Sequence, residues 1–163
     1  MLSNFFNSSP IIPTIKASVQ NAGAFTNGDV LFDWASFDIP RGPARLLGAT
    51  ISIRTNQVGQ ALGSGIALVF AKDDGTNTAP ATMGTEHAAF GLSNFNRTDI
   101  IGFVDGSSGE ISGSQGIQTA VAYQTTSVNQ PGLVLESSPN SGSTTGTDRF
   151  YVGGLAAGSL ILT

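Results

Sequence analysis

Apolar and polar residues alternate strictly over residues 49–54, where every second side chain is apolar. This period of two predicts a β-strand with one buried face. Residues 65–71 carry large apolar side chains on one face and small or apolar ones on the other, which predicts a strand covered on both sides and therefore central in its sheet. The uncharged, glycine-containing stretch 57–64 between them predicts that the two strands form a hairpin.

Residues 29–39 form the most aromatic of the predicted strands, and their apolar side chains change face partway along. One face carries Val30, Phe32 and Trp34, and the other carries Ala35, Phe37 and Ile39. Because a regular strand would expose half of this set, we predict a bulge or bend near residues 34–36, or a strand that crosses between sheets. The sequence Pro40-Arg41-Gly42-Pro43 that follows predicts a rigid corner.

Six further short stretches predict strands, because apolar residues recur in them between clusters of Gly, Ser, Asn or Pro. They are residues 14–20, 98–104 (with Ile101 and Phe103 facing inward), 118–125, 132–136, 149–152 and 159–162. A hint of helix at residues 86–90 supports no more than one turn. We therefore predict an all-β fold, a two-sheet antiparallel sandwich or a barrel, and a jelly-roll-like sandwich of about eight strands fits best.

The chain of 163 residues fits one domain, which we place at residues 14–163 after an extended N-terminal arm, residues 1–13. The arm contains two apolar pairs, Phe5 with Phe6 and Ile11 with Ile12. One interpretation is a frayed terminus, and the other is an arm that docks on a neighbouring subunit. On the second interpretation these four residues are a partner interface.

Only 11% of the residues are charged, against about 25% in typical soluble proteins. A surface of Ser, Thr, Asn, Gln and Gly repels its neighbours weakly, which suits a subunit of a dense assembly. The net charge of −4 and the scattered basic residues argue against nucleic acid as a partner. The sequence contains no cysteine, no visible secretion signal and no apolar run long enough to span a membrane, so we expect neither disulfides nor a membrane partner.

The candidate catalytic residues are few. His87 is the sole imidazole, and no nucleophile elbow or metalloprotease motif accompanies it, so we interpret it as a loop histidine. Asp33 and Asp38 could be imagined as the carboxylate pair of a glycosidase, but the sequence does not give their separation. We therefore expect no enzyme activity and no cofactor.

Calcium binding is less weakly indicated than catalysis by His87. Its candidates are two oxygen-rich loops, residues 73–77 and 105–110, although neither has the acid spacing and terminal Glu of an EF-hand. Trp34, Tyr123 and Tyr151 could form an aromatic platform for a sugar, although buried core aromatics are the commoner use in a sandwich. Polar turns and a packed core are the simpler interpretations of both sets.

Four stretches carry a resemblance to a known family: residues 31–34 (LFDW), 39–46 (IPRGPARL), 136–142 (ESSPNSG) and 149–155 (RFYVGGL). On these the chain resembles virion structural proteins of tailed bacteriophages, notably cyanophages and other marine phages, and among them the jelly-roll cement or decoration proteins of the head. None of the four is a catalytic motif.

The resemblance implies a non-enzymatic homotrimer, made in the host cytoplasm and located in the virion, that binds the major capsid protein on the outer head surface. It would stabilise the shell by multivalent contacts. The alternatives are a carbohydrate-binding module of a tail or fibre, and a calcium-dependent carbohydrate-binding domain of a bacterial enzyme.

Overall fold

The structure is a computed structural model that describes residues 23–42, 44–46, 49–54, 65–73, 80–91, 99–105, 117–122, 133–136 and 147–159. These residues form eight β-strands and no helix, which confirms the predicted all-β class. In chain order the strands are β1 (Val30–Pro40), β2 (Ala44–Leu46), β3 (Ala49–Arg54), β4 (Gly65–Lys72), β5 (Ile100–Asp105), β6 (Ile117–Ala122), β7 (Leu133–Leu135) and β8 (Thr147–Ala157).

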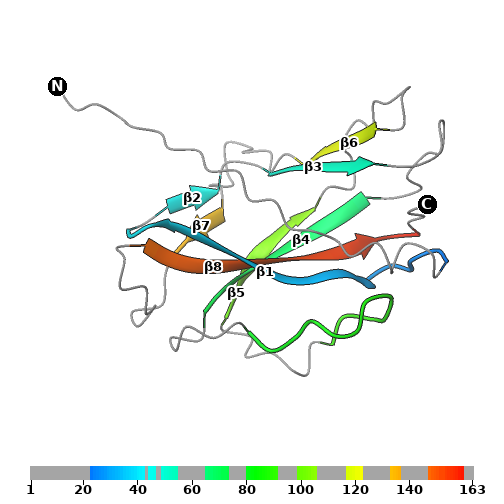
Figure 1. The fold of residues 1–163 in the computed structure, drawn as a ribbon, viewed down its shortest axis with the longest axis horizontal. Coiled ribbons are helices and arrows are strands. Elements are labelled where there is room, and N and C mark those ends of the chain that lie inside the picture. Colours follow the sequence, from blue (N-terminus) through cyan, green and yellow to red (C-terminus); the bar gives the residue numbers. More distant parts are fainter. Residues whose placement is uncertain are drawn as a thin grey trace.

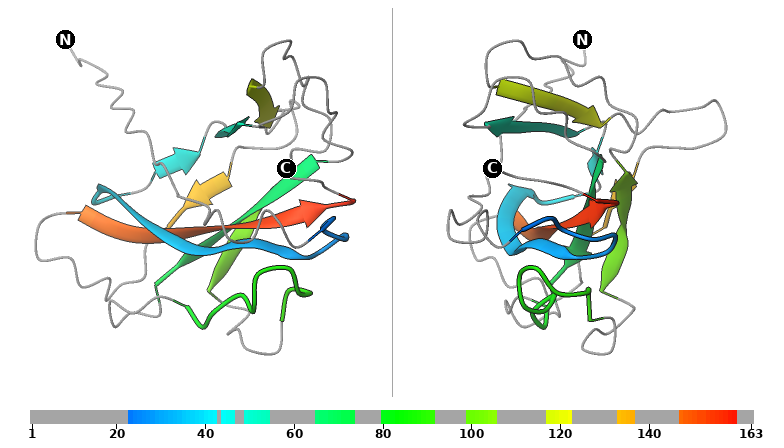
Figure 2. Two further views of the ribbon diagram at one scale, coloured as in Figure 1. Left: turned by 45° about the vertical axis from the view of Figure 1, so that its right-hand side comes forward. Right: turned by 90° about the vertical axis from the view of Figure 1, so that its right-hand side faces the viewer.

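Four of these strands form an antiparallel sheet in the order β1-β8-β4-β5, and the others form two short ladders, β2 with β7 and β3 with β6. The four-stranded sheet is the middle layer in Figures 1 and 2. The two ladders lie on one side of it, which we call the inner face. Residues 80–91, the green trace below the sheet in Figure 1, lie against the opposite, outer face, and we call them the covering segment.

The pairing of the described strands is nested along the chain. The first strand pairs with the eighth, the second with the seventh, the third with the sixth and the fourth with the fifth, always antiparallel. The two short ladders follow one another, because Leu46 pairs with Leu133 and Ala49 pairs with Ala122. The additional pairing of β4 with β8 joins the outermost and innermost pairs into one sheet.

The strands predicted at residues 49–54 and 65–71 are present as β3 and β4, but the prediction that they form a hairpin is wrong. β3 pairs with β6, whereas β4 lies between β8 and β5. The interior position of β4 is the one predicted from its two apolar faces. An alternating pattern indicates which face of a strand is buried, but not which strand supplies its hydrogen bonds, and the hairpin prediction failed for that reason.

β1 contains the irregularity predicted from its sequence. Its register against β8 shifts twice between Val30 and Ala35. As a result Leu31, Phe32 and Phe37 are all buried in the same core cluster, which strict alternation along a strand would not permit. The bulged strand therefore presents both halves of its apolar set to the protein interior.

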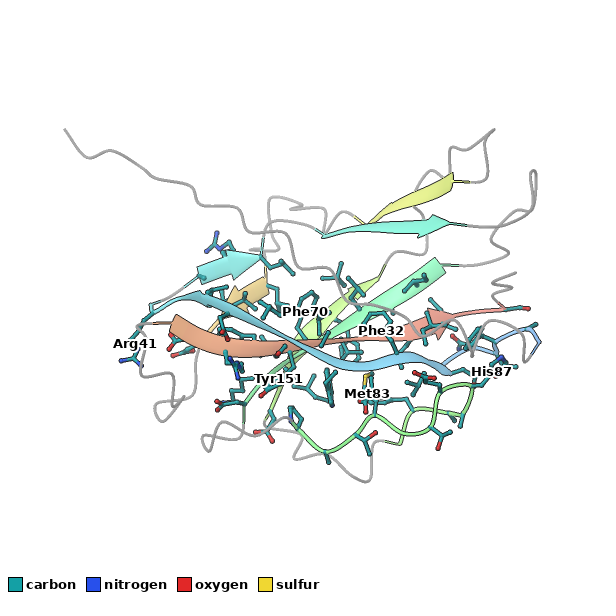
Figure 3. All side chains as sticks on the ribbon, in the orientation of Figure 1. Phe32, Arg41, Phe70, Met83, His87 and Tyr151 are labelled. Atoms are coloured by element: carbon teal, nitrogen blue, oxygen red, sulfur yellow. The ribbon has the colours of Figure 1, made fainter. Side chains whose placement is uncertain are left out.

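The main hydrophobic core lies between the inner face and the β2–β7 ladder. The Phe37 ring stacks on Phe150 at a centroid distance of 5.9 Å and meets Phe70 edge-on at 6.3 Å. In Figure 3, Phe70 lies above the sheet, whereas Met83 and Tyr151 lie below it. The other buried members of this core are Phe25, Leu31, Phe32, Ile66, Leu68, Val104, Leu135, Val152 and Ala156.

Two successive glycines of β8 allow close packing on both faces of the sheet. A Cβ at Gly153 would overlap the Sδ atom of Met83 on the outer face, and one at Gly154 would overlap the ring of Phe32 on the inner face. Successive residues of a strand point to opposite faces, so this pair opens space on both sides at one place. The sheet can therefore hold a thioether on one side and an aromatic ring on the other.

The prediction that Phe103 faces inward is wrong, because its side chain is 51% exposed. The register of β5 against β4 is irregular at Ile101, where Gly102 pairs with Phe70 but Ile100 pairs with Ala71. Because Ile101 is an extra residue on β5, the inward and outward positions on its two sides are out of step. Ile101 and the buried Val104 both pack against the main core, and Phe103 is turned outward.

The remaining strand predictions have mixed outcomes. Residues 118–125, 132–136 and 149–152 correspond to β6, β7 and part of the longer β8. β8 ends at Ala157, so Ser159 is not in a strand, and residues 14–20 and 160–162 lie outside the described residues. Residues 86 and 87 form a turn, not a helix.

We expect Gly154→Ala to destabilise the fold by about 1–3 kcal/mol, because the added methyl group meets the stiff ring of Phe32 in a packed core. Gly153→Ala is the matched control and should cost less, because it meets the flexible end of Met83, which can shift. Urea unfolding followed by circular dichroism measures both. Equal costs, or a larger cost at Gly153, would contradict this account of the two faces.

Candidate functional site

The predicted partner interface, Phe5, Phe6, Ile11 and Ile12, lies outside the described residues, as does the whole arm, residues 1–13. Tyr123 and most of the two oxygen-rich loops, residues 74–77 and 106–110, also lie outside them. The structure therefore leaves these predictions untested. Within the described residues, the features that bear on function are the two edges of the four-stranded sheet.

The β1 edge is covered at its start by the covering segment. The Val30 N–H donates to the Ala88 carbonyl at 3.0 Å, and the His87 N–H donates to the Val30 carbonyl at 3.0 Å. The Phe90 N–H donates to the carbonyl of Gly28 at 3.0 Å. These bonds satisfy backbone groups that an edge strand would otherwise present to another chain.

Asp33 and Trp34 hold the other end of the covering segment. The Asp33 carboxylate accepts hydrogen bonds from the Thr82 hydroxyl at 2.8 Å and from the Met83 N–H at 3.0 Å. Trp34 donates from Nε1 to the Ala81 carbonyl at 2.9 Å. The two side chains that the sequence offered for catalysis and for sugar stacking thus fix a loop to the sheet.

Met83 is the apolar anchor of the covering segment and is fully buried. It packs in a second hydrophobic cluster with Val30, Val69 and Leu155, and Trp34 lies against the same cluster. Burying such a side chain contributes about 1.5–3 kcal/mol relative to leaving it exposed. The outer face is therefore a second core, closed by one loop.

His87 lies in the turn at the far end of the covering segment. The Ala88 N–H donates to the Thr85 carbonyl at 3.1 Å, and His87 has a φ of 67°, a left-handed conformation that is unfavourable for a side-chain residue. Its ring stacks on Phe25 at 3.9 Å and its Nε2 lies 3.2 Å from the carbonyl oxygen of Gly23. These contacts assign His87 a structural role and offset the backbone cost.

The end of the sheet at Pro40 carries the charged groups. Asp38 and Arg149 face each other across β1 and β8, and the guanidinium donates two hydrogen bonds to the carboxylate at 2.8 and 3.0 Å. These hydrogen bonds hold the pKa of Asp38 below its ordinary value. The hydrogen bond to Asp38 and the negative charge of its carboxylate raise the pKa of Arg149. Both side chains are about 40% exposed, so the pair contributes little net stability, about 0–1 kcal/mol.

Asp148 supports the corner after β1 and is almost completely buried. Its carboxylate accepts hydrogen bonds from Arg41 Nε at 3.4 Å and from the Gly42 N–H at 3.3 Å. Gly42 has a φ of 130°, which glycine alone adopts readily. Arg41 and Gly42, the described residues of the predicted corner after Pro40, are therefore tied to β8 by a buried carboxylate.

The β5 edge differs from the β1 edge. Among the described strands β5 pairs with β4 alone, and Phe103 projects from it with half of its surface exposed. Val134 on β7 is the other large apolar side chain among the described residues that is exposed, at 45%. An edge strand with an exposed aromatic ring can bind an extended segment of another chain.

The weaker chemical candidates gain no support from the geometry. Asp33 and Asp38 contact different partners, so the structure does not unite them as a catalytic pair. Asp73 is buried, and the described residues include no group of three His, Cys, Asp or Glu side chains placed to hold a metal ion. Tyr151 is buried in the sheet, which agrees with a core role.

Sequence reasoning missed the covering segment and the outward-facing Phe103. The signal for the first is the Gly153-Gly154 pair, because glycines inside a predicted strand mark a close approach by another part of the chain. Met83 is the one large apolar residue within residues 80–89, which also marks a buried anchor. The outward turn of Phe103 depends on a bulge and leaves no comparable signal.

Comparison of the chain with models of known protein families, with curated proteins and with solved structures found no match. No helix formed by the described residues is long and apolar enough to cross a membrane. The function must therefore be argued from the residues and from the two edges of the sheet.

We expect His87→Gly to be more stable than His87→Ala by about 1 kcal/mol. Both variants lose the stacked ring, but glycine accepts the positive φ without the steric cost that alanine retains. The neighbouring Glu86, which does not have a positive φ, is the matched control, and there alanine should be at least as stable as glycine. Thermal unfolding of the four variants decides, and the opposite order at His87 would contradict the assignment.

Proposed function

We propose that this chain is a non-enzymatic structural protein of a phage virion, a cement or decoration protein that binds the outer surface of the head and stabilises the shell. The observation that carries the proposal is a contrast: the candidate catalytic and binding side chains have structural contacts, whereas one edge of the sheet presents an exposed aromatic ring. Asp33, Trp34, His87 and Asp148 hold loops and corners. Among the described strands β5 pairs with β4 alone, and the ring of Phe103 on it is half exposed, as a contact surface for another chain would be.

The nested strand pairing supports the finer fold proposal, a jelly-roll-like sandwich. Such a fold is built from eight antiparallel strands in two facing sheets. A pairing of first with eighth, second with seventh, third with sixth and fourth with fifth is what a long hairpin produces when it is rolled up. The four-stranded sheet and the ladder of β2 with β7 would be parts of the two facing layers.

The stabilising mechanism we propose is multivalency. A homotrimer that touches several copies of the major capsid protein makes its second and third contacts at a high effective concentration, so modest interfaces add to a strong attachment. The arm would supply the apolar contacts through Phe5, Phe6, Ile11 and Ile12. The low fraction of charged residues limits repulsion between crowded subunits.

The glycan-binding alternative, a module of a tail or fibre, requires exposed aromatic faces. Trp34 packs against the Met83 cluster and donates its indole N–H to the covering segment, and Tyr151 is buried. These two rings thus stabilise the fold, and among the described residues they leave Phe103 as the exposed aromatic ring, which alone does not make a platform. The alternative therefore ranks second.

Co-sedimentation with phage heads that lack the protein tests the proposal. We expect the full chain to pellet with the heads. The double variant Phe5→Ser/Phe6→Ser should reduce the apparent affinity by about a hundredfold, because two phenylalanine side chains that become buried on binding would contribute about 3 kcal/mol or more. Ser8→Ala/Ser9→Ala, in the same arm, is the matched control and should bind like the unaltered chain.

Deletion of residues 1–12 should also weaken attachment without lowering the unfolding temperature. A folded chain that fails to pellet with heads would overturn the cement role. Unchanged occupancy after the double substitution of the phenylalanines, or after the deletion, would overturn the role of the arm.

A further inference from the structure

We propose that the β5 edge binds residues 14–20 of a second copy of this chain as an added strand. Residues 14–20 lie outside the described residues, and the inference combines their sequence with the geometry of the described edge. It concerns how copies of the chain associate and does not depend on binding to a phage head.

The two edges of the four-stranded sheet are protected to very different degrees. β1 is bonded to the covering segment through Val30, carries the carboxylates of Asp33 and Asp38, and ends at Pro40. Charges, proline and a covering loop are the devices that prevent an edge strand from pairing with another chain. Among the described strands β5 pairs with β4 alone, and its protection is limited to a bulge near its start and the single charge of Asp105 at its end, while the ring of Phe103 is half exposed.

The sequence of residues 14–20 fits this edge. It has seven residues, against six in β5, and alternates apolar Ile15, Ala17 and Val19 with polar side chains. Added to β5 with its apolar side on the outer face, it would place Ile15, Ala17 and Val19 beside the exposed ring of Phe103, which pairs with Val69 of the outer-face cluster. Backbone hydrogen bonds would supply affinity, and the alternation would fix the register.

Charge favours this occupant over a second β5 strand. Residues 1–22 contain Lys16 and no acidic residue, whereas β5 is bracketed in sequence by Asp99 and Asp105. Antiparallel pairing of two β5 strands centred on Gly102 would place Asp99 opposite Asp105, and like charges directly opposite destabilise a ladder. A segment that contains one positive charge and no acidic residue avoids this repulsion.

The reach of the chain favours a segment from another copy. Gly23 lies beside His87, next to the start of β1, on the far side of the sheet from β5. Only three residue steps separate Gln20 from Gly23, a span of at most about 11 Å. The edges β1 and β5 are three strand spacings apart, about 14 Å. Residues 14–20 therefore cannot lie along the β5 edge of their own sheet.

An arm that binds the edge of the next copy is a head-to-tail contact, in which each copy gives one strand and receives one. Such contacts close into rings when the rotation between copies permits, and a trimer is one such ring. The association would thus use residues 14–20 and β5, whereas the proposed capsid contact uses residues 5–12. Each proposal can fail without the other.

The test is the mass of full-length variants in solution, measured by light scattering. Phe103→Lys alters the edge and keeps the arm, whereas Ile15→Asp/Val19→Asp alters the arm and keeps the edge. Each variant alone should fall to the mass of one chain, 16.7 kDa. A mixture of the two at high concentration should form a two-chain complex, because the intact arm of one binds the intact edge of the other.

Val134→Lys, at a comparably exposed apolar residue on β7, is the matched control and should keep the oligomer of the unaltered chain. Circular dichroism checks that each variant is folded, and Phe103→Thr replaces Phe103→Lys if the latter unfolds. A monomeric unaltered chain overturns the proposal. So does an oligomer that survives Ile15→Asp/Val19→Asp, which would indicate pairing of two β5 edges, or a mixture that stays monomeric.

Discussion

The two successive glycines at positions 153 and 154 of β8 set how closely the layers of this protein approach. β8 lies between β1 and β4 in the sheet. Its inner face belongs to the main core through Val152 and Ala156, and its outer face belongs to the second cluster through Leu155. The missing side chains admit Met83 on the outer face and the Phe32 ring on the inner face. Since packing in both cores depends on these contacts, the sheet, the covering segment and the main core are coupled at one place in the chain.

Much of the fold could be predicted from the sequence, because alternation reports burial directly. The strand at residues 49–54, the doubly apolar strand at 65–71 and the bulge within residues 29–39 are all present. The partner of each strand could not be predicted, since β3 would show the same pattern paired with β4 or with β6. The orientation of Phe103 could not be predicted for a related reason. A bulge at Ile101 reverses which residues of β5 face the core, and the sequence carries no sign of it.

The candidate site was harder to predict than the fold. Asp33 and Trp34 looked like a possible acid and a possible sugar platform, but contacts with residues almost fifty positions away, Thr82 and Ala81, give them structural roles. Such contacts leave no local signature. The difference between the covered β1 edge and the β5 edge likewise follows only from the topology. This difference is the basis of our proposal that the chain is a subunit of an assembly. On that account one edge is closed by the chain itself and the other is completed by a neighbour.

The central claim is that β8 is the element on which both cores depend, and native-state hydrogen exchange tests it most directly. Strands buried on both faces exchange only when the whole domain unfolds, whereas loops open locally at lower free energy. The account predicts that the β8 and β4 amides exchange with the free energy of global unfolding, while the amides of His87, Phe90 and Gly91 in the covering segment exchange earlier. Exchange of β8 through a local opening, with β4 still protected, would contradict it.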